Sequence, residues 1–212
     1  DKYECWIDRK QSYEVSKDVY DAIETSKQWT TSIDLAAIAT HINTGSLYPL
    51  LMGSSLPHFE GSRARWGEDV FEFSGMTVNS DAGISRERIV ENAMMYINAP
   101  YLWGGRSPFG IDCSGFTQLV YKIAGKKLPR DAYQQAEIGQ TLSFVEEAQS
   151  GDLAFFDNEE GSIVHVGILL QDNEIIHASG KVRIDKIDHQ GIFNVDTKRY
   201  SHKLRLIKKI LK

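Results

Sequence analysis

The sequence predicts an α+β protein in which helices precede a meandering antiparallel sheet, with a small β-barrel in front of both. Two segments near the middle of the chain, 85–100 and 113–125, have apolar residues at helical spacing. Short apolar segments that are typical of strands follow, at 151–157, 164–171, 174–179 and 203–211. Helices followed by a run of strands are the pattern of an α+β domain.

The first eighty residues predict the small barrel. Strand-like stretches occur at 3–7 (YECWI), 37–42 (AIATHI), 46–53 (SLYPLLMG) and 68–75 (EDVFEFSG), separated by turn residues. Residues 12–29 fit either a helical turn or a long loop. The polar, small-residue stretch NSDAGIS at 79–85 predicts a linker. We therefore expect two domains, 1–82 and 83–212.

Both central helices have recognisable ends. Ser85 is a plausible N-cap of the first helix, and Pro100 follows shortly after its end. The second helix should begin at or just before Cys113, and Gly125 stands where a C-terminal cap is expected. Its apolar stripe consists of Phe116, Leu119, Val120 and Ile123.

Composition excludes several classes of protein. Hydrophobic residues make up 42% and charged residues 25%, and the net charge of −5 gives no basic surface for nucleic acid or an anionic membrane. We expect no integral membrane segment, because the sequence has no apolar run near the roughly 18 residues that a span needs. The charged opening DKYECWIDRK does not have the pattern of a signal peptide.

The sequence places an unusual loop in front of one of its two cysteines. The stretch PYLWGGRSPFGIDCSGF, residues 100–116, brings four glycines and two prolines before and around Cys113. A helix start lowers a thiol pKa, because unpaired N–H groups and the helix dipole favour the thiolate. Asp112 could cap that helix, while Ser114 and Gly115 are small enough to leave the sulfur open. Cys5 is interpreted as a small buried hydrophobe.

A nucleophilic cysteine needs a base, which is usually histidine. His165 and His177 lie in successive strand segments. With a three-residue loop between the strands, His177 lies opposite Gly167, and His165 is its diagonal neighbour on the same face of the sheet. With a two-residue loop, the register shifts by one residue and the two histidines no longer share a face. Alternatively the pair is incidental, or it binds a metal, although no further ligand at matching spacing completes a site. The other histidines, which are His41, His58, His189 and His202, are expected at the surface or in loops.

Five segments in order, PYLWGG…DCSGF, LPRDAYQQA, GDLAFFD, HVGILL and IIHAS, resemble the NlpC-type cysteine peptidases of bacterial cell walls, which are small papain-like enzymes. The resemblance covers roughly residues 84–210. It implies Cys113 as nucleophile, His165 as general base and His177 as the third, polar member. It also implies that Tyr101 and the Cys113 N–H form the oxyanion hole. No cofactor or metal is implied.

The N-terminal part adds a second resemblance. YECWI resembles the end of a bacterial SH3-like barrel, so that a first barrel is truncated, and about 32–78 resembles a second, divergent one. This arrangement is similar to that of γ-D-glutamyl-L-diamino-acid endopeptidases. It implies that Asp112 binds the free amine of an L-Ala residue, with Tyr3 as a barrel candidate, and that Ser114 binds the D-Glu carboxylate. Tyr133 stands where the family's RDASxQ pattern has a serine, and the resemblance implies that this position contacts the same carboxylate.

The expected function is hydrolysis of the bond between γ-D-Glu and the diamino acid in murein stem peptides, L-Ala-γ-D-Glu-diamino acid, in cell-wall peptide recycling. The alternatives are a hydrolase that acts on intact wall, a relative that runs acyl transfer or amide cleavage, and an inactive wall-binding SH3-like module. The choice between diaminopimelate and lysine, the oligomeric state, and a location in the envelope, periplasm or cytoplasm stay open.

Overall fold

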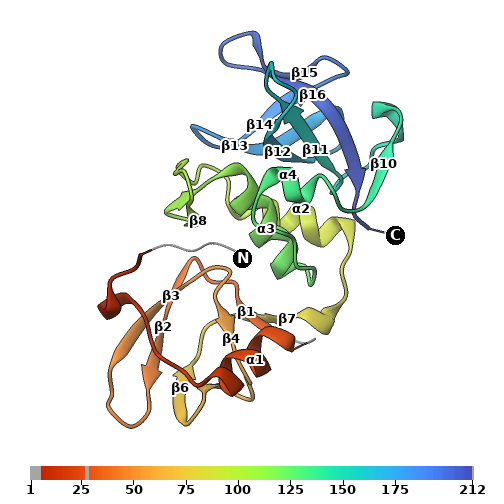
Figure 1. The fold of residues 1–212 in the computed structure, drawn as a ribbon. Helices are drawn as coiled ribbons and strands as arrows, with labels where there is room; N and C mark the ends of the chain where they lie inside the picture. Colours follow the sequence, from red (N-terminus) through yellow and green to blue (C-terminus); the bar gives the residue numbers. More distant parts are fainter. Residues whose placement is uncertain (1–5, 27–28, 212) are drawn as a thin grey trace. The chain divides into compact units, whose positions relative to one another are not determined.

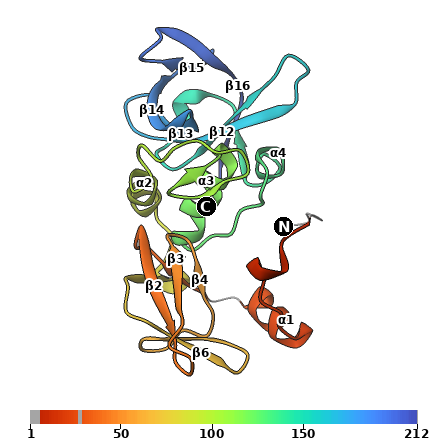
Figure 2. The same ribbon diagram turned by 90° about the vertical axis from the view of Figure 1, so that its left-hand side faces the viewer.

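A computed structural model describes residues 6–26 and 29–211 of the chain. The chain divides into two compact units, Asp1–Ala82 and Gly83–Lys212, and each is described by itself. Their elements are seen from two directions in Figures 1 and 2. No helix among the described residues is long and apolar enough to cross a membrane.

The first unit contains a small β-barrel, as the sequence predicts. Its strands are β1 Thr30–Ser32, β2 Ala36–His41, β3 Leu47–Leu51, β4 Ser55–Leu56, β5 Arg63–Trp66, β6 Asp69–Phe73 and β7 Thr77–Asn79. They form two antiparallel sheets, β4-β1-β7 and β3-β2-β6-β5. The buried side chains of Ala39, Leu56, Ala64, Phe71 and Phe73 form the core of this unit.

The start of the first unit differs in part from the prediction. Residues 17–25 form helix α1, Lys17–Thr25, with the Ser16 hydroxyl accepting a hydrogen bond from the Val19 N–H. One-turn 3₁₀ helices lie at Arg9–Gln11 (η1) and Ser80–Ala82 (η2). In YECWI, Trp6 and Ile7 are exposed and lie outside any strand, so the strand prediction is wrong there. Tyr3 and Cys5 lie outside the described residues.

One histidine of the first unit is buried on a strand where a surface or loop position was predicted. His41 lies on β2 and is only 8% exposed. Its Nε2 is 2.9 Å from a carboxylate oxygen of Asp69, and its Nδ1 accepts a hydrogen bond from the Thr44 N–H. The ring also contacts Phe71 edge-on. These local hydrogen bonds therefore offset the free-energy cost of burying this imidazole.

The second unit follows the predicted order of helices and strands. Its helices are α2 Arg86–Met94, α3 Cys113–Ile123 and α4 Ala132–Gln135, with the 3₁₀ turn η3 at Val145–Glu147. Its strands are β8 Arg106–Ser107, β9 Gly110–Ile111, β10 Gln140–Leu142, β11 Leu153–Asp157, β12 Ile163–Leu169, β13 Glu174–Ser179, β14 Lys181–Ile187, β15 Gly191–Asn194 and β16 Arg199–Lys209. The α+β class is confirmed.

The caps predicted for α2 and α3 are also confirmed. The Ser85 hydroxyl accepts a hydrogen bond from the Arg88 N–H at the start of α2. Gly125 follows the end of α3 with φ of 100°, a left-handed conformation that favours glycine. The stripe of α3 that was predicted to be apolar is buried throughout.

The large sheet closes on itself. The strand order is β10-β16-β11-β12-β13-β14-β15, and the long strand β16 also pairs with β15. Helices α3 and α4 pack on β12, and α3 also packs on β13 (Figure 1). A core cluster that includes Ala154, Phe156 and Ile175 fills the closed sheet. The start of α3 is thereby held beside the strands that carry His165 and His177.

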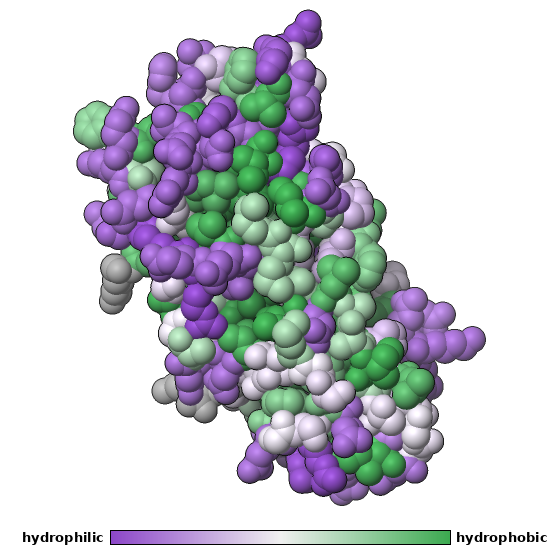
Figure 3. Space-filling view, turned by 180° about the vertical axis from the view of Figure 1, so that it is seen from behind, coloured by the Kyte–Doolittle hydropathy of each residue, from purple (hydrophilic) through white to green (hydrophobic). Residues whose placement is uncertain are grey.

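The surface is mixed in character. Figure 3 shows one face of the molecule, on which apolar side chains (green) reach the surface between hydrophilic ones (purple). Exposed large apolar side chains occur in both units, among them Ile38 and Leu47 in the first and Trp103 and Phe109 in the second. Single exposed apolar residues are normal for a folded protein.

Candidate active site

Cys113 is the first residue of α3, at the position that the sequence predicts. The Asp112 carboxylate caps the helix by accepting a 2.7 Å hydrogen bond from the Gly115 N–H. A Cβ at Gly115 would lie 2.6 Å from the carbonyl oxygen of Gly105, so the glycine lets the preceding loop approach the helix start. Cys113 is a free thiol and is 8% exposed.

The thiol opens into a pocket of about 270 Å³ in the second unit. Its lining consists of Tyr101, Cys113, Val164, His165, Ala178, Ser179, Gly180 and His202. The N–H of Tyr101 donates to the carbonyl of Gly180 at 3.0 Å, and Pro100 forms a bridge with Lys181. The loop before Cys113 is thus fastened to the β13–β14 turn, which places the half-buried Tyr101 in the same pocket as the thiol.

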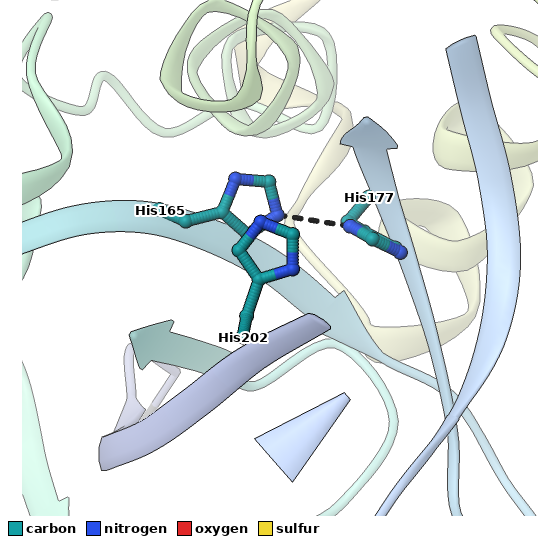
Figure 4. Close-up of side chains that lie close together, drawn as sticks. All are labelled: His165, His177 and His202. Carbon is teal, nitrogen blue, oxygen red and sulfur yellow. Dashed lines mark hydrogen bonds between the residues drawn. The ribbon is translucent and has the colours of Figure 1, made fainter. Parts of the chain in front are cut away.

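The predicted pairing of two histidines is confirmed. His177 lies opposite Gly167 in the β12–β13 ladder. His165 Nε2 and His177 Nδ1 are 2.9 Å apart (Figure 4). A Cβ at position 167 would lie 2.9 Å from the Cβ of His177, so a glycine is required there for the two strands to approach this closely. In Figure 4 the other ring nitrogen of His165, Nδ1, points away from His177.

Two residues of the site were missed by the sequence analysis. His202, predicted at the surface or in a loop, lies on β16 with its ring stacked on that of His165, with centroids 4.1 Å apart (Figure 4). Asp185 on β14 accepts a hydrogen bond from His177 Nε2 at 3.1 Å. The alternation of His202 with Leu204, which packs against the core of the closed sheet, could have indicated that His202 shares the inward face of β16.

The electrostatics of the site differ from those expected at a helix start. Burial and the Asp112 carboxylate raise the pKa of the Cys113 thiol to about 11, although N–H groups of Val166, Ser114 and Cys113 itself act in the opposite direction. Burial and the neighbouring imidazoles lower the pKa of His165 well below its ordinary value. At neutral pH the thiol is protonated and the imidazole is neutral, because desolvation penalises both charged forms.

Burial also affects the other polar groups of the pocket. It lowers the pKa of His202 to about 4, with a further contribution from His177. It raises the pKa of Tyr101, with further contributions from the Cys113 thiolate that forms at high pH and from the Asp112 carboxylate. Tyr101 therefore keeps its hydroxyl proton at neutral pH and can donate a hydrogen bond.

The three histidines form the group among the described residues that most resembles a metal site. One ring nitrogen of each lies within 4.8 Å of the others. However, the rings of His165 and His202 are stacked with only 21° between their planes. A metal binds in the plane of each imidazole that ligates it, and two stacked planes do not meet at one ion. The arrangement suits proton transfer better than metal binding.

Asp112 and Ser114, which were predicted to bind substrate, both contact Arg130. The Arg130 guanidinium lies 3.0 and 2.6 Å from the two carboxylate oxygens of Asp112 and donates to the Ser114 hydroxyl at 2.9 Å. The Gly104 N–H also donates to Asp112. Both carboxylate oxygens therefore have internal partners, and the predicted amine contact of Asp112 would be added to these.

The motif RDAYQQ supports the start of α3. Besides Arg130, the buried side chain of Gln135 donates to the carbonyl of Ser114 at 3.0 Å and accepts from the Thr117 hydroxyl at 2.7 Å. Tyr133 lies on α4 with 54% of its surface exposed. Tyr3 lies outside the described residues. The substrate contacts of Ser114, Tyr133 and Tyr3 stay predictions.

Comparison with known proteins gives consistent matches to the second unit. Residues 98–200 match the sequence model described as the NlpC/P60 family. The gamma-D-glutamyl-L-lysine dipeptidyl-peptidase of Bacillus subtilis (strain 168) is 40% identical over 94 residues, which are 43% of this chain and 31% of that protein. The NlpC/p60 domain of the peptidoglycan hydrolase SagA is 30% identical, covering 59% of this chain and 99% of that domain, with a TM-score of 0.48.

A solved structure resembles nearly the whole chain. The crystal structure of an NlpC/P60 family protein from Bacillus cereus ATCC 10987 has a TM-score of 0.74 and 23% identity, covering 93% of this chain and 67% of that one. This likeness supports the predicted fold. The chain spans about a third of the length of the Bacillus subtilis relative.

Proposed function

The chain belongs to the NlpC/P60 family, and from this premise we propose that it is a cysteine peptidase that hydrolyses the γ-D-glutamyl–diamino-acid bond of murein stem peptides. The observation that carries the proposal is the pocket shared by Cys113 and His165, whose imidazole is oriented by His177. The name of the Bacillus subtilis relative supports the choice of the γ-D-glutamyl bond. In the proposed substrate a free N-terminal L-Ala precedes D-Glu.

The first half of the reaction forms a thioester. His165 Nδ1 takes the proton of the Cys113 thiol as the sulfur attacks the side-chain carbonyl carbon of D-Glu. The oxyanion accepts hydrogen bonds from the Tyr101 hydroxyl and the Cys113 N–H. The imidazolium then gives its proton to the amine of the diamino acid as the C–N bond breaks. L-Ala-γ-D-Glu stays bound to the sulfur.

The second half releases the dipeptide. His165 removes a proton from water, and the oxygen of that water attacks the thioester carbonyl at the same oxyanion site. Collapse of the tetrahedral intermediate expels the sulfur, which recovers its proton from His165. Since thiol and imidazole are both neutral at rest, proton transfer accompanies the attack, and a preformed thiolate–imidazolium pair is not required.

Substrate recognition is assigned to residues around the thiol. Asp112 contacts the L-Ala ammonium, Ser114 contacts the D-Glu α-carboxylate, and Tyr133 takes the place of the serine found in related sequences. Tyr3, which lies outside the described residues, is a further candidate for contact with the same ammonium.

The test is mass spectrometry of the products of defined peptides. We expect the wild-type protein to release L-Ala-γ-D-Glu from L-Ala-γ-D-Glu-L-Lys or its diaminopimelate counterpart, and Cys113→Ala to release none while keeping its circular dichroism spectrum. An N-acetylated peptide and whole sacculi serve as comparisons. Preference for blocked peptide or sacculi would indicate a hydrolase of intact wall, and binding to sacculi without cleavage by the wild-type protein would indicate a wall-binding module.

A further inference from the structure

A buried carboxylate lies behind the two histidines of the candidate site. Asp185 on β14 has a side chain with no exposed surface, and its Oδ2 is 3.1 Å from His177 Nε2. We infer that Asp185 is a positioning residue: it fixes the tautomer of His177 and, through it, that of His165, so that His165 Nδ1, the ring nitrogen that does not contact His177, is unprotonated. Only the expected effect of Asp185 on kcat rests on the proposed function, and the assignment of the tautomers does not.

The register of β13 and β14 explains how Asp185 reaches His177. His177 lies opposite Arg183 and Ile175 lies opposite Asp185 in this antiparallel pair. Asp185 is therefore a diagonal neighbour of His177 on one face of the sheet, within reach of its ring. His165 has the same diagonal relation to His177 in the β12–β13 pair. Two successive hairpins thus align three polar side chains.

The carboxylate of Asp185 is held ionised by its donors. Arg183 donates to both oxygens, at 2.8 Å from Nε and 2.9 Å from a terminal nitrogen, and the Val195 N–H donates at 2.9 Å. Burial by itself would raise the pKa of Asp185, but the hydrogen bonds from His177, Arg183 and Val195 lower it to about 2. An ionised carboxylate only accepts hydrogen bonds, so His177 Nε2 must carry a proton.

The positions of the remaining protons follow along the chain of hydrogen bonds. A neutral His177 with a proton on Nε2 has an acceptor at Nδ1. The 2.9 Å contact then requires His165 to donate from Nε2, which leaves His165 Nδ1 without a proton. With the opposite tautomers, Nδ1 of His165 would carry a proton and could not accept one from Cys113. Asp185 therefore selects the reactive form.

A purely structural role for Asp185 makes a different prediction. The Arg183–Asp185 pair would then matter for folding alone, and its loss would leave the tautomers unchanged. Arg183 has a second acidic partner, Asp196, at 2.8 Å, whose side chain is 71% exposed. Asp196→Asn removes a negatively charged partner of the same guanidinium and leaves the Asp185–His177 contact intact. It is therefore a matched control.

The experiment reads tautomers by two-bond ¹H–¹⁵N NMR of the histidine rings, without substrate. We expect the wild-type protein and Asp196→Asn to show Nε2–H forms of both His165 and His177. In Asp185→Asn the amide can donate to Nε2, and we expect Nδ1–H forms of both rings to become populated. The wild-type spectrum alone overturns the inference if His177 carries its proton on Nδ1, so the test stands even if the variant does not fold.

Kinetics supply a second readout on the free tripeptide. For Asp185→Asn we expect kcat to fall by up to about 10⁴-fold, the loss that a wrong histidine tautomer causes in a Ser-His-Asp triad, with KM changed less than about threefold. A folded Asp185→Asn with wild-type kcat, or with reduced kcat and unchanged tautomers, would overturn the inference. If the wild-type protein cleaves no murein peptide, the proposed function fails while the NMR result still decides the role of Asp185.

Discussion

Gly167→Ala tests whether the close approach of β12 and β13 determines activity. The added Cβ would lie 2.9 Å from His177 Cβ and 2.7 Å from Ile175 Cδ1. Carbon atoms in ordinary contact are about 3.5 Å apart or more, so His177 must retreat by about 0.6 Å. That displacement lengthens the 2.9 Å contact between His165 and His177 to about 3.5 Å, beyond a normal hydrogen bond.

Two separate losses are expected from this variant. Overpacking should lower the free energy of unfolding by about 1–3 kcal/mol, measured by urea denaturation. Displacement of His177 should lower kcat on L-Ala-γ-D-Glu-L-Lys by about 10- to 100-fold, since misplacement of about 1 Å can cost 10²-fold. The assay is release of L-Lys under conditions in which the variant is fully folded.

The controls separate stability from geometry. Ile168 lies on the same strand as Gly167, and its buried side chain is on the opposite face. Ile168→Val should lower the free energy of unfolding by about 0.5–1.5 kcal/mol without changing kcat. In Gly167→Ala/Ile175→Val the Cδ1 clash is removed but the clash with His177 Cβ stays, so stability should recover in part and kcat should not. Full activity of Gly167→Ala, or its recovery in the double variant, would refute the reasoning.

Two further predictions concern the charges around the thiol. Because the pKa of Cys113 is raised to about 11, its alkylation rate by iodoacetamide should rise about tenfold per pH unit from pH 7 to 10; a plateau below pH 7 would show a preformed ion pair instead. Arg130→Met leaves the Asp112 carboxylate buried without its cation and should cost about 3–5 kcal/mol in urea unfolding. Adding Asp112→Asn should recover part of that loss, and a cost below about 1 kcal/mol for Arg130→Met would contradict the role of the pair.

Local sequence determined the start of α3 and the nucleophile it carries. The capping aspartate at 112, the small residues at 114 and 115 and the apolar stripe behind them are all local signals, and the helix begins at Cys113 as predicted. The pairing of His165 with His177 was also predictable, because the length of one hairpin loop fixes the parity of two strands. These features depend on neighbours within about fifteen residues along the chain.

Tertiary structure decided what surrounds those residues. His202 stacks on His165 only because β16 closes the sheet, a contact between segments far apart in sequence. Local signals predicted a lowered thiol pKa from the helix start, but the pKa of Cys113 is raised, since desolvation depends on everything packed around the sulfur. Sequence by itself thus determined the helix start that carries Cys113 and the pairing of His165 with His177. The folded environment determined which further groups surround them and how all of these are protonated, because burial is a property of the whole packed unit and not of any segment.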